Sequence, residues 1–416
     1  MKKILFLFLV IGNTVFSQTA TLDKVVEAAK QNYPLVKQKD LIRQTKEISI
    51  ENIGKGYLPQ FTLSGQATYQ SDVTSVKIPV PGISITPPSK DQYKVVADVN
   101  QLIWDGGFIK EQKNIQQLNA DVEDQKIEVE LYKLTERINQ IYLSILFIEE
   151  QLKQTGLIKK DLETGLKKTE AQVQNGVAFK SNLNLLKAEI LKIEQRVIEL
   201  KATRKGLTDV LSLFTGEQYS EATVFEKPSA NFASGETIQR PELTLFQKQQ
   251  NLLNGQNNII KARNLPKTSL FFQGGYGRPG LNMLENNFKT FYITGVRFNW
   301  AFGGLYTAKK EKQLIDINKK IISVQQDVFV LNTNTQLKQQ LSEMDKISQL
   351  IAKDLEIIEL RVKVKEAANA QLENGVITAN DYLREVNAED QARQTLIVHQ
   401  IQLLQAQINY QTTKGK

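Results

Sequence analysis

The sequence predicts a mainly α-helical chain that also contributes four short strands to a membrane β-barrel. All ten prolines of the 416-residue chain lie outside two long stretches, residues 106–227 and 280–416. The very long helical segment in each stretch opens with a Gly-Gly pair, and a short alternating apolar/polar segment precedes each pair. The same order of strands, long helix, turn and further helix is therefore written twice.

The N-terminus has the features of an export signal. Lys2 and Lys3 precede the apolar run Ile4–Ile11, and Val15 and Ser17 are small residues spaced for cleavage after Ser17. This pattern predicts a secretory signal peptide over residues 1–17. A buried N-terminal helix is the alternative. The run is shorter than the roughly 20 residues of a membrane-spanning helix, so we expect an exported chain without an inner-membrane helix.

Composition excludes several classes of chemistry. The chain has no cysteine, which rules out disulfides, thiolate metal sites and a lipid-bearing cysteine. Its single histidine, His399, lies between Leu396 and Leu403 at helical spacing, which favours packing over a ligand or a base. The net charge of +8 is scattered among nearly as many acids, as on a solvated helical surface, so nucleic-acid binding is not indicated. We expect no catalytic residues, no metal and no cofactor.

Four blocks recur in the same order at a spacing of about 200 residues, which indicates an internal duplication. They pair Asn32-Tyr33-Pro34 with Gln239-Arg240-Pro241, Leu58-Pro59 with Leu265-Pro266, Gly106-Gly107 with Gly303-Gly304, and Asn175-Gly176-Val177 with Asn374-Gly375-Val376. We therefore divide the mature chain into repeat 1, residues 18–228, and repeat 2, residues 229–416.

Each repeat divides into the same elements. In repeat 1 we expect a helix over 21–56, strands over 60–70 and 92–104, a long helix over 106–174 and a helix over 178–214. In repeat 2 we expect a helix over 239–263, strands over 268–277 and 290–302, a long helix over 304–373 and a helix over 379–412. Pro34 and Pro241 fall in the opening turns of the first helices, where proline is tolerated. Pro59 and Pro266 end those helices, because the residue before a proline avoids the helical conformation.

The strands show strict alternation. Residues 61–70 place Phe61, Leu63 and Tyr69 on one face and polar residues on the other. Ten residues match a tilted membrane strand, which needs about 9–11. Aromatic residues gather at the strand ends, as in the girdle of a membrane barrel: Tyr69, Tyr93, Trp104, Tyr276, Tyr292 and Trp300. A soluble sheet with one wet face is the alternative. Long loops over Ser71–Lys90 and Arg278–Asn287 fit one outer side of a barrel.

The long helices carry a heptad seam. Leu131, Leu134, Ile138, Ile141, Ile145, Ile148 and Leu152 step by three and four residues. At 1.5 Å per residue such a helix is on the order of 100 Å long, and two of the shorter helices end to end roughly match it. We expect a helical tube of long helices alternating with stacked short pairs. A dimeric coiled coil is the rival arrangement, but it needs no strands between the helices.

Four membrane strands cannot close a barrel alone, because single-chain barrels begin at eight strands and open sheet edges are not tolerated in lipid. The barrel must then be shared between subunits with cyclic symmetry. Two chains give eight strands filled by side chains, and three give twelve strands around a lumen. The inward residues are small and polar, which favours a wet interior: Thr62, Ser64, Thr68 and Gln70.

The order and spacing of these motifs resemble the TolC-like outer membrane efflux proteins, over essentially the whole mature chain. The duplication, the Leu-Pro pairs, the Gly-Gly junctions and the Asn-Gly turns carry the resemblance. It implies a homotrimer in the outer membrane lipid, with a twelve-stranded barrel continued by a helical barrel across the periplasm. It also implies two partners, a periplasmic adaptor and an inner membrane pump, and a passive conduit for efflux or type I secretion.

The resemblance also implies roles for particular residues. The turns at Val173–Ser181 and Leu372–Asp381 would form the periplasmic tip where the adaptor docks, with Asn175, Gly176, Val177, Asn374, Gly375 and Val376 at their centres. Asp381 matches the first acid of the family's closed aperture. Arg384 stands where the family has a second acid, and Asn182 is the neutral match in repeat 1. Asp381 also suits a helix N-terminus, where the dipole favours an acid; the two roles are compatible.

Two other functions remain open at the level of sequence. A periplasmic coiled-coil adaptor or structural stalk would share the helices, but it would carry soluble β domains in place of membrane strands. A secreted enzyme would have to rely on paired carboxylates, because the chain has one histidine and no cysteine. The pattern of acidic residues instead indicates solvent-exposed helix faces.

Overall fold

The computed structural model describes residues 19–76, 86–229 and 237–415. The predicted signal peptide, residues 1–17, and the middle of the predicted loop Ser71–Lys90 lie outside these ranges. The chain forms two compact units. Unit 1 holds Met1–Val36, Glu128–Pro241 and Phe329–Lys416, and unit 2 holds Lys37–Ile127 and Glu242–Val328. Each unit takes segments from both sequence repeats, so the repeats are not separate domains.

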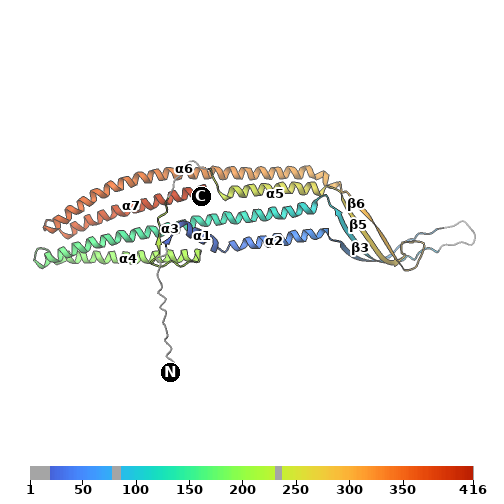
Figure 1. Ribbon diagram of the computed structural model, residues 1–416, viewed down its shortest axis with the longest axis horizontal. Helices are drawn as coiled ribbons and strands as arrows, with labels where there is room; N and C mark the ends of the chain where they lie inside the picture. The colour runs from blue at the N-terminus through green and yellow to red at the C-terminus, as the bar shows by residue number, and fades with distance from the viewer. Residues whose placement is uncertain (1–18, 77–85, 230–236, 416) are drawn as a thin grey trace, which may run out of the picture. The chain divides into compact units, whose positions relative to one another are not determined.

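Unit 2 contains an antiparallel four-stranded sheet of order β2-β3-β5-β6 (Figure 1). The strands are β2 (Gln60–Tyr69), β3 (Asp91–Trp104), β5 (Lys267–Arg278) and β6 (Lys289–Asn299). Each lies within two or three residues of the range expected from alternation. The central pairing of β3 with β5 joins the two repeats in one sheet.

Four helices accompany the sheet in unit 2. They are α2 (Val36–Gly54), the first part of α3 (Phe108–Gln174), α5 (Pro241–Arg263) and the first part of α6 (Gly303–Glu373). A short 3-10 turn, η1 (Lys55–Tyr57), joins α2 to β2. α3 and α6 are 67 and 71 residues long and run on into unit 1. At 1.5 Å per residue each is on the order of 100 Å long.

The single helix predicted over residues 21–56 is wrong. The structure has α1 (Leu22–Asn32) and α2, separated at Tyr33. Tyr33 is extended, with ψ of 127°, because the ring of a following proline disfavours the helical region for the residue before it. Pro34 therefore interrupts a helix and does not lie in the opening turns of one. Pro241 does begin α5, as expected.

Unit 1 packs α1, α3, α4 (Lys180–Thr215), α6 and α7 (Ala379–Lys414). The heptad seam of α3 supplies Leu134, Ile138 and Ile145 to its largest apolar cluster. A small parallel pair that the alternation did not predict, β1 (Thr19–Ala20) with β4 (Val224–Phe225), covers this cluster. The buried hydroxyl of Tyr142 lies 2.8 Å from the Ala20 carbonyl and 2.7 Å from the Glu226 carbonyl. Burial raises the pKa of Tyr142, so it remains a neutral donor.

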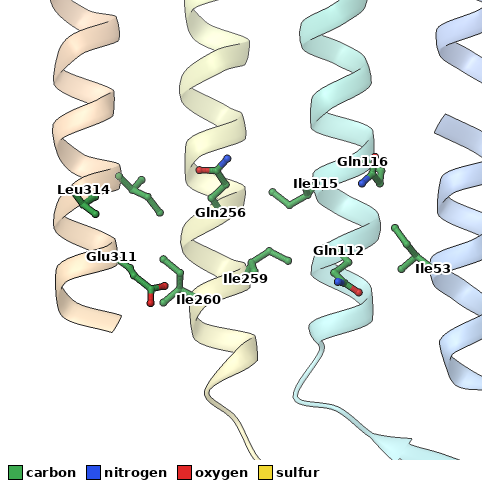
Figure 2. Close-up of a pocket in the computed structure, with 10 residues that line it drawn as sticks. Ile53, Gln112, Ile115, Gln116, Gln256, Ile259, Ile260, Glu311 and Leu314 are labelled. Carbon is green, nitrogen blue, oxygen red and sulfur yellow. The ribbon is translucent and has the colours of Figure 1, made fainter. Parts of the chain in front are cut away.

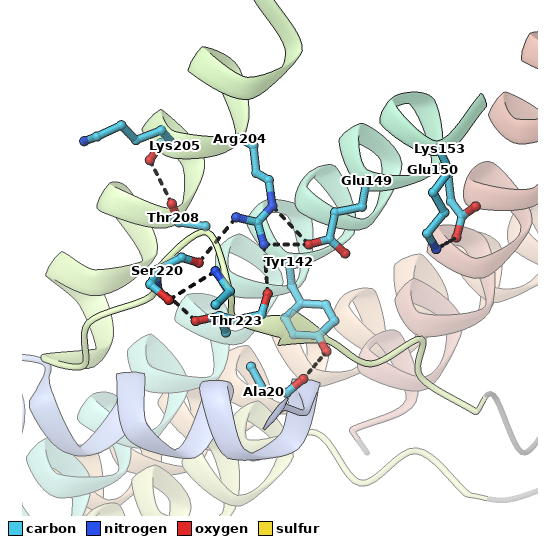
Figure 3. Close-up of polar contacts among 11 residues, drawn as sticks. Ala20, Tyr142, Glu149, Glu150, Lys153, Arg204, Lys205, Thr208, Ser220 and Thr223 are labelled. Carbon is cyan, nitrogen blue, oxygen red and sulfur yellow. Dashed lines mark hydrogen bonds and ion pairs between the residues drawn. The ribbon is translucent and has the colours of Figure 1, made fainter. Parts of the chain in front are cut away.

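A buried arginine ties α4 to the segment that follows it (Figure 3). Arg204 donates from Nη2 to Glu149 Oε1 at 2.8 Å and to the Thr223 carbonyl at 2.9 Å, and from Nη1 to the Ser220 carbonyl at 3.4 Å. A buried charge is tolerated only when it is paired and hydrogen-bonded. This guanidinium therefore fixes the chain between α4 and β4 against α3.

Candidate functional site

The sheet carries a continuous apolar face that is open to solvent in the single chain. It contains Phe61, Leu63, Tyr69, Tyr93, Val95, Leu270, Phe272, Tyr276, Tyr292, Val296 and Phe298, and we call it the apolar face. The register aligns these side chains across strands; Phe61 pairs with Val99, which pairs with Phe272. Leu63 is 76 % exposed and Phe298 is 64 % exposed. Exposed apolar surface on this scale marks a surface that is covered in the working protein.

The opposite face, here the polar face, carries the charges. Lys94, Asp98 and Arg297 are the charged residues of the four described strands that lie away from the strand ends. All three share the face of Thr62 and Ser64. Away from the strand ends the apolar face has no charged residue in this sheet. Asp91 and Arg278 share this face at its loop end. Lipid excludes charge most strongly near the bilayer centre, so this division is the one expected of a membrane strand.

Aromatic residues occupy both ends of the sheet. Tyr93 and Tyr276 stack on Phe288 at the loop end, with ring centroids 6.4 and 5.5 Å apart. Trp300 lies at the helix end, where its Nε1 donates to the Asn264 carbonyl at 3.1 Å. Amphipathic rings at two levels are typical of strands that meet a membrane interface on each side.

The sheet is not closed. β2 and β6 are its edges, and within the described residues neither has a strand on its outer side. A row of unpaired backbone groups is a template for pairing with another strand. Together with the apolar face, these edges predict that other chains complete the sheet.

The junctions between strands and long helices use their glycines differently. Gly106 and Gly107 have φ of +71° and +82°, whereas Gly303 and Gly304 belong to the first turn of α6 and have no positive φ. A Cβ at Gly106 would lie 2.5 Å from Leu265 Cβ, so only glycine fits there. Pro59 and Pro266 each stand one residue before a strand, β2 and β5.

Asp105 is a junction residue that the sequence reasoning missed. Its side chain accepts from the Gly107 amide at 2.9 Å and from the Ile109 amide at 2.7 Å. These are orphan donors at the start of α3, and a carboxylate there is a favourable cap. An aspartate directly before Gly-Gly and a helical pattern was the available signal.

The two Asn-Gly turns have the same backbone geometry. Gly176 and Gly375 have φ of +77° and +69°. In each turn the glycine amide donates three residues back and the next amide donates five residues back; for Gly375 and Val376 the distances are 3.1 and 2.9 Å. This is the Schellman ending of a helix, which requires a left-handed residue. Asn175 and Asn374 precede the glycines, as the last residues before each turn.

The two turns lie against each other. A Cβ at Gly375 would be 3.8 Å from Val177 Cγ1, and Gln172 Nε2 donates to the Leu372 carbonyl at 2.7 Å. Three apolar side chains around the turns are largely exposed: Val177, Phe179 and Val376. Figure 1 shows the ends of the α3–α4 and α6–α7 hairpins side by side. The pair presents a small apolar surface on backbone held by these hydrogen bonds.

Asp381 is the third residue of a capping box whose N-cap is Thr378, at the start of α7. The Thr378 side chain accepts from the Asp381 amide at 3.3 Å, and Asp381 Oδ2 accepts from the Thr378 amide at 3.1 Å and from its hydroxyl at 2.7 Å. These hydrogen bonds, first that of the side chain, lower the pKa of Asp381. Arg384 is exposed and pairs with Glu385 at 3.2 Å, and Asn182 lies in the first turn of α4. The predicted role of Asp381 as an acid at a helix N-terminus is therefore confirmed; the aperture role of the three residues stays a proposal.

A charged network that was not expected from the sequence joins the two hairpins. Lys365 of α6 pairs with Asp161 of α3 at 2.8 Å and with Glu389 of α7 at 2.6 Å, and Arg393 also pairs with Glu389 at 2.6 Å. Burial alone lowers the pKa of Lys365, but the hydrogen bonds to the two carboxylates outweigh it and the pKa is raised. Burial likewise raises the pKa of Glu389, but Lys365 and Arg393 lower it overall.

An open groove of about 490 Å³ lies among α2, α3, α5 and α6 in unit 2 (Figure 2). Its lining is mainly apolar, with Ile53, Ile115, Ile259, Ile260, Leu314 and Ile315 beside three glutamines and one acid. That acid, Glu311, is held by Arg263 at 2.5 Å.

Within the described residues, no group of three or more histidine or carboxylate side chains is placed to hold a metal ion. None of the helices in these ranges is long and apolar enough to cross a membrane. His399, the single histidine, is half-buried, with Nδ1 2.6 Å from Asp354 Oδ2.

Neither the known family models nor the curated protein sequences gave a match to this chain. Solved structures do match it. The outer membrane protein VceC from Vibrio cholerae shares 14 % identity at a TM-score of 0.64, covering 94 % of this chain and 95 % of its own. The CmeC outer membrane channel of Campylobacter jejuni shares 14 % at 0.62, covering 95 % and 85 %. The open-state MtrE outer membrane channel of Neisseria gonorrhoeae shares 12 % at 0.63, covering 95 % and 89 %. The chain therefore has the fold of the TolC-like outer membrane channels.

Proposed function

We propose that the protein is the outer membrane channel of an efflux or type I secretion system. The observation that carries the proposal is the open sheet, with two unpaired edges and an apolar face that has no charge away from the strand ends. Lipid covers the apolar face, and strands of further copies cover the edges. The structures with a similar fold that are described as outer membrane channels support the proposed channel function.

The channel is a homotrimer with a twelve-stranded barrel. Four strands per chain need at least two copies to reach eight strands, and three copies to leave a lumen. The polar face then lines the lumen. The channel is a passive conduit, and its driving force comes from an inner membrane pump.

A periplasmic adaptor docks on the paired turns at Gly176 and Gly375. The exposed Val177, Phe179 and Val376 offer an apolar contact surface on a backbone held by the Schellman hydrogen bonds. Beside this tip, Asp381, Arg384 and Asn182 line the aperture. Because Arg384 replaces an acid, the aperture carries mixed charge and is less cation-selective than a doubled acidic ring.

Fractionation and cross-linking of the full-length protein test the proposal. We expect recovery in the outer membrane fraction, extraction only by detergent, and cross-linked products that end at the size of three chains. A periplasmic adaptor or stalk would instead be released with the soluble periplasm. Recovery there, or a stable monomer in detergent, would overturn the channel assignment.

A further inference from the structure

The charges on the polar face are not balanced. In the interior of the strands the polar face has two cations, Lys94 and Arg297, and one acid, Asp98. At the strand ends it adds Lys267, which lies over the Phe108 ring at 4.9 Å, and Lys289, which Glu285 pairs. The described part of the face therefore has an excess of positive charge.

Both interior cations are seated on aromatic rings in the same way. Lys94 Nζ lies 4.7 Å from the centroid of Phe291, and Arg297 Cζ lies 4.7 Å from the centroid of Phe271. Each ring lies over a glycine of the neighbouring strand. A Cβ at Gly275 would be 2.3 Å from Phe291, and one at Gly295 would be 3.2 Å from Phe271. A small residue, a ring and a cation thus form one layered unit, and the sheet contains two of them.

This layering fixes the cations in place without neutralising them. A cation over a ring face is attracted by the ring quadrupole, and its flexible stem is held along the apolar surface. Within the described residues neither Lys94 nor Arg297 has an acidic partner. One side of each charge is covered by an aromatic ring.

Asp98 is too distant to cancel either charge. It stands four residues from Lys94 along β3, about 14 Å at about 3.4 Å per residue. Its register partners Gln273 and Ile293 place it four residues from the row of Arg297 as well. Both separations exceed the screening length of about 8 Å at physiological salt. The Asp98 carboxylate accepts instead from Gln273 Nε2 at 3.4 Å.

We propose that the polar face selects small anionic solutes, with Lys94 and Arg297 as the selecting residues. The inference rests on the proposed channel function, which makes the polar face the wall of a lumen. Three copies then place a ring of Lys94 and a ring of Arg297 at two levels of the barrel. Charges of one sign along a narrow wall raise the local concentration of the opposite ion.

The absence of cysteine in this chain allows a direct test. Ser64 is exposed on the polar face, one row from Lys94, and Leu63 is exposed on the apolar face. We would introduce Ser64→Cys into the full-length protein in its membrane and measure its reaction with two thiosulfonates, one bearing a sulfonate and one a trimethylammonium. Leu63→Cys is the matched control on the other face. This readout requires access from the barrel mouth and no opening of the periplasmic aperture.

We expect Ser64→Cys to react faster with the anionic reagent, and Leu63→Cys to react slowly with both. Adding Lys94→Gln should lower the anion-to-cation rate ratio roughly 10-fold, the low end of the range for focused fields. Adding Arg297→Gln should lower it less, because Arg297 lies six residues along β6 from the row of Ser64. Adding Asp98→Asn should raise the anion-to-cation rate ratio. Added salt should reduce the effect of each of these substitutions on that ratio. Each single substitution is measured as well, so that one poorly assembled variant does not decide the result.

The experiment distinguishes failure of the channel proposal from failure of the anion-selectivity proposal. If Ser64→Cys is inert, or reacts no faster than Leu63→Cys, the polar face lines no water and the proposed channel falls together with this inference. If Ser64→Cys reacts but its rate ratio does not respond to Lys94 and Arg297, the channel stands and the anion selectivity is wrong. Reversal potentials in planar bilayers under a KCl gradient give the same sign test for chloride against potassium.

Discussion

At the scale of single residues, positions that look alike in sequence have different physical roles. Gly106 and Gly375 both adopt positive φ, but a Cβ would collide with a neighbour only at Gly106; at Gly375 it would make ordinary contact with Val177. Gly304 has ordinary helical backbone and is limited by its neighbour, since a Cβ there would lie 2.2 Å from Asn264 Oδ1. The two Gly-Gly pairs align in the repeat, yet the need for glycine has different causes. At Gly106 both the positive φ and the lack of space require it, whereas at Gly304 only the lack of space does.

The first junction allows these two constraints to be separated. Gly107→Ala meets open space, so it should lose only the cost of a left-handed alanine, about 1 kcal/mol. Gly106→Ala adds a collision with Leu265 and should lose about 2–4 kcal/mol in total. Thermal unfolding midpoints in detergent would give the comparison. Equal losses for both variants would mean that the contact at Leu265 relaxes without cost.

The Lys365 network predicts a pH-dependent contribution to stability. Lys365→Met should destabilise by about 2–3 kcal/mol near neutral pH, because Glu389 is buried and keeps only Arg393. The Glu389 pKa is lowered from 4.5, so this contribution is present above pH 4.5 and is lost as the pH falls through the folded-state pKa. The Lys365 pKa is raised from 10.5, so alkali removes it only above that value.

Lys363→Met is the matched control for Lys365. Lys363 stands two residues away on α6 and makes an exposed pair with Glu359, and exposed pairs contribute little. Unfolding midpoints of both variants would be measured at neutral pH and below pH 4. An equal loss in the two, or a Lys365→Met deficit that persists in acid, would contradict the network as the source.

At the scale of elements, periodicity predicted much of the fold. Alternation placed all four strands of the sheet within a few residues, and the seam from Leu131 to Leu152 identified the buried side of α3. The break at Tyr33 was missed because a proline can also sit in a first helical turn. The pair β1–β4 was missed because two residues carry no period. The Lys365 network could not be predicted, because it joins charges about 200 residues apart that read individually as solvent-facing.

The two faces of β2 give the sharpest test of a membrane strand. Leu63→Arg puts a charge on the apolar face and should cost about 2–4 kcal/mol if it lies near the bilayer centre. Ser64→Arg puts the same charge one residue along, on the polar face, and should cost little. Assembled trimer in the outer membrane is the measurement. Equal effects would show that the strand is not membranous or that the faces are reversed.

The turn at Gly375 tests the docking surface. Gly375→Val forces a β-branched side chain into φ of +69° and should strain the turn by roughly 1–2 kcal/mol. That is too little to dissociate a large assembly, so trimer and membrane insertion should persist while adaptor capture and efflux weaken. Adaptor pull-down and drug susceptibility are compared at equal trimer level. Unchanged capture and efflux would remove the docking assignment, and loss of the trimer would indicate a packing role.

At the scale of the whole molecule, the duplication distributes every compact unit over both repeats. The sheet needs β2 and β3 from the first repeat and β5 and β6 from the second, and its two outer edges come one from each. A chain built in this way presents one edge strand that can meet the other edge strand of an identical copy. That is a head-to-tail contact, which closes into a ring when the rotation between copies permits.

Disulfide trapping tests this closure in the cysteine-free chain. We would combine Ser64→Cys on β2 with single cysteines on the same face of β6, at Phe291, Ile293 or Gly295. Since β2 and β6 are separated by β3 and β5 in one chain, we expect disulfides between chains. At the best-matched position, oxidation should give covalent dimers and trimers and nothing larger. Cross-linking within one chain would show a sheet that closes on itself, and longer ladders would show an open polymer.

The open edges of β2 and β6 also have a consequence for biogenesis. A newly exported copy carries two unsatisfied backbone rows and a large apolar surface until its neighbours arrive, and such species aggregate. In the proposed trimer, completion requires encounters between copies, so its rate should rise steeply with the supply of new chains. At low synthesis rates, unassembled chains would persist and be removed by proteases. At high synthesis rates, unassembled chains would exceed the capacity of the chaperones that bind them. Abundance of the finished assembly should therefore respond to gene dosage with a threshold and a ceiling.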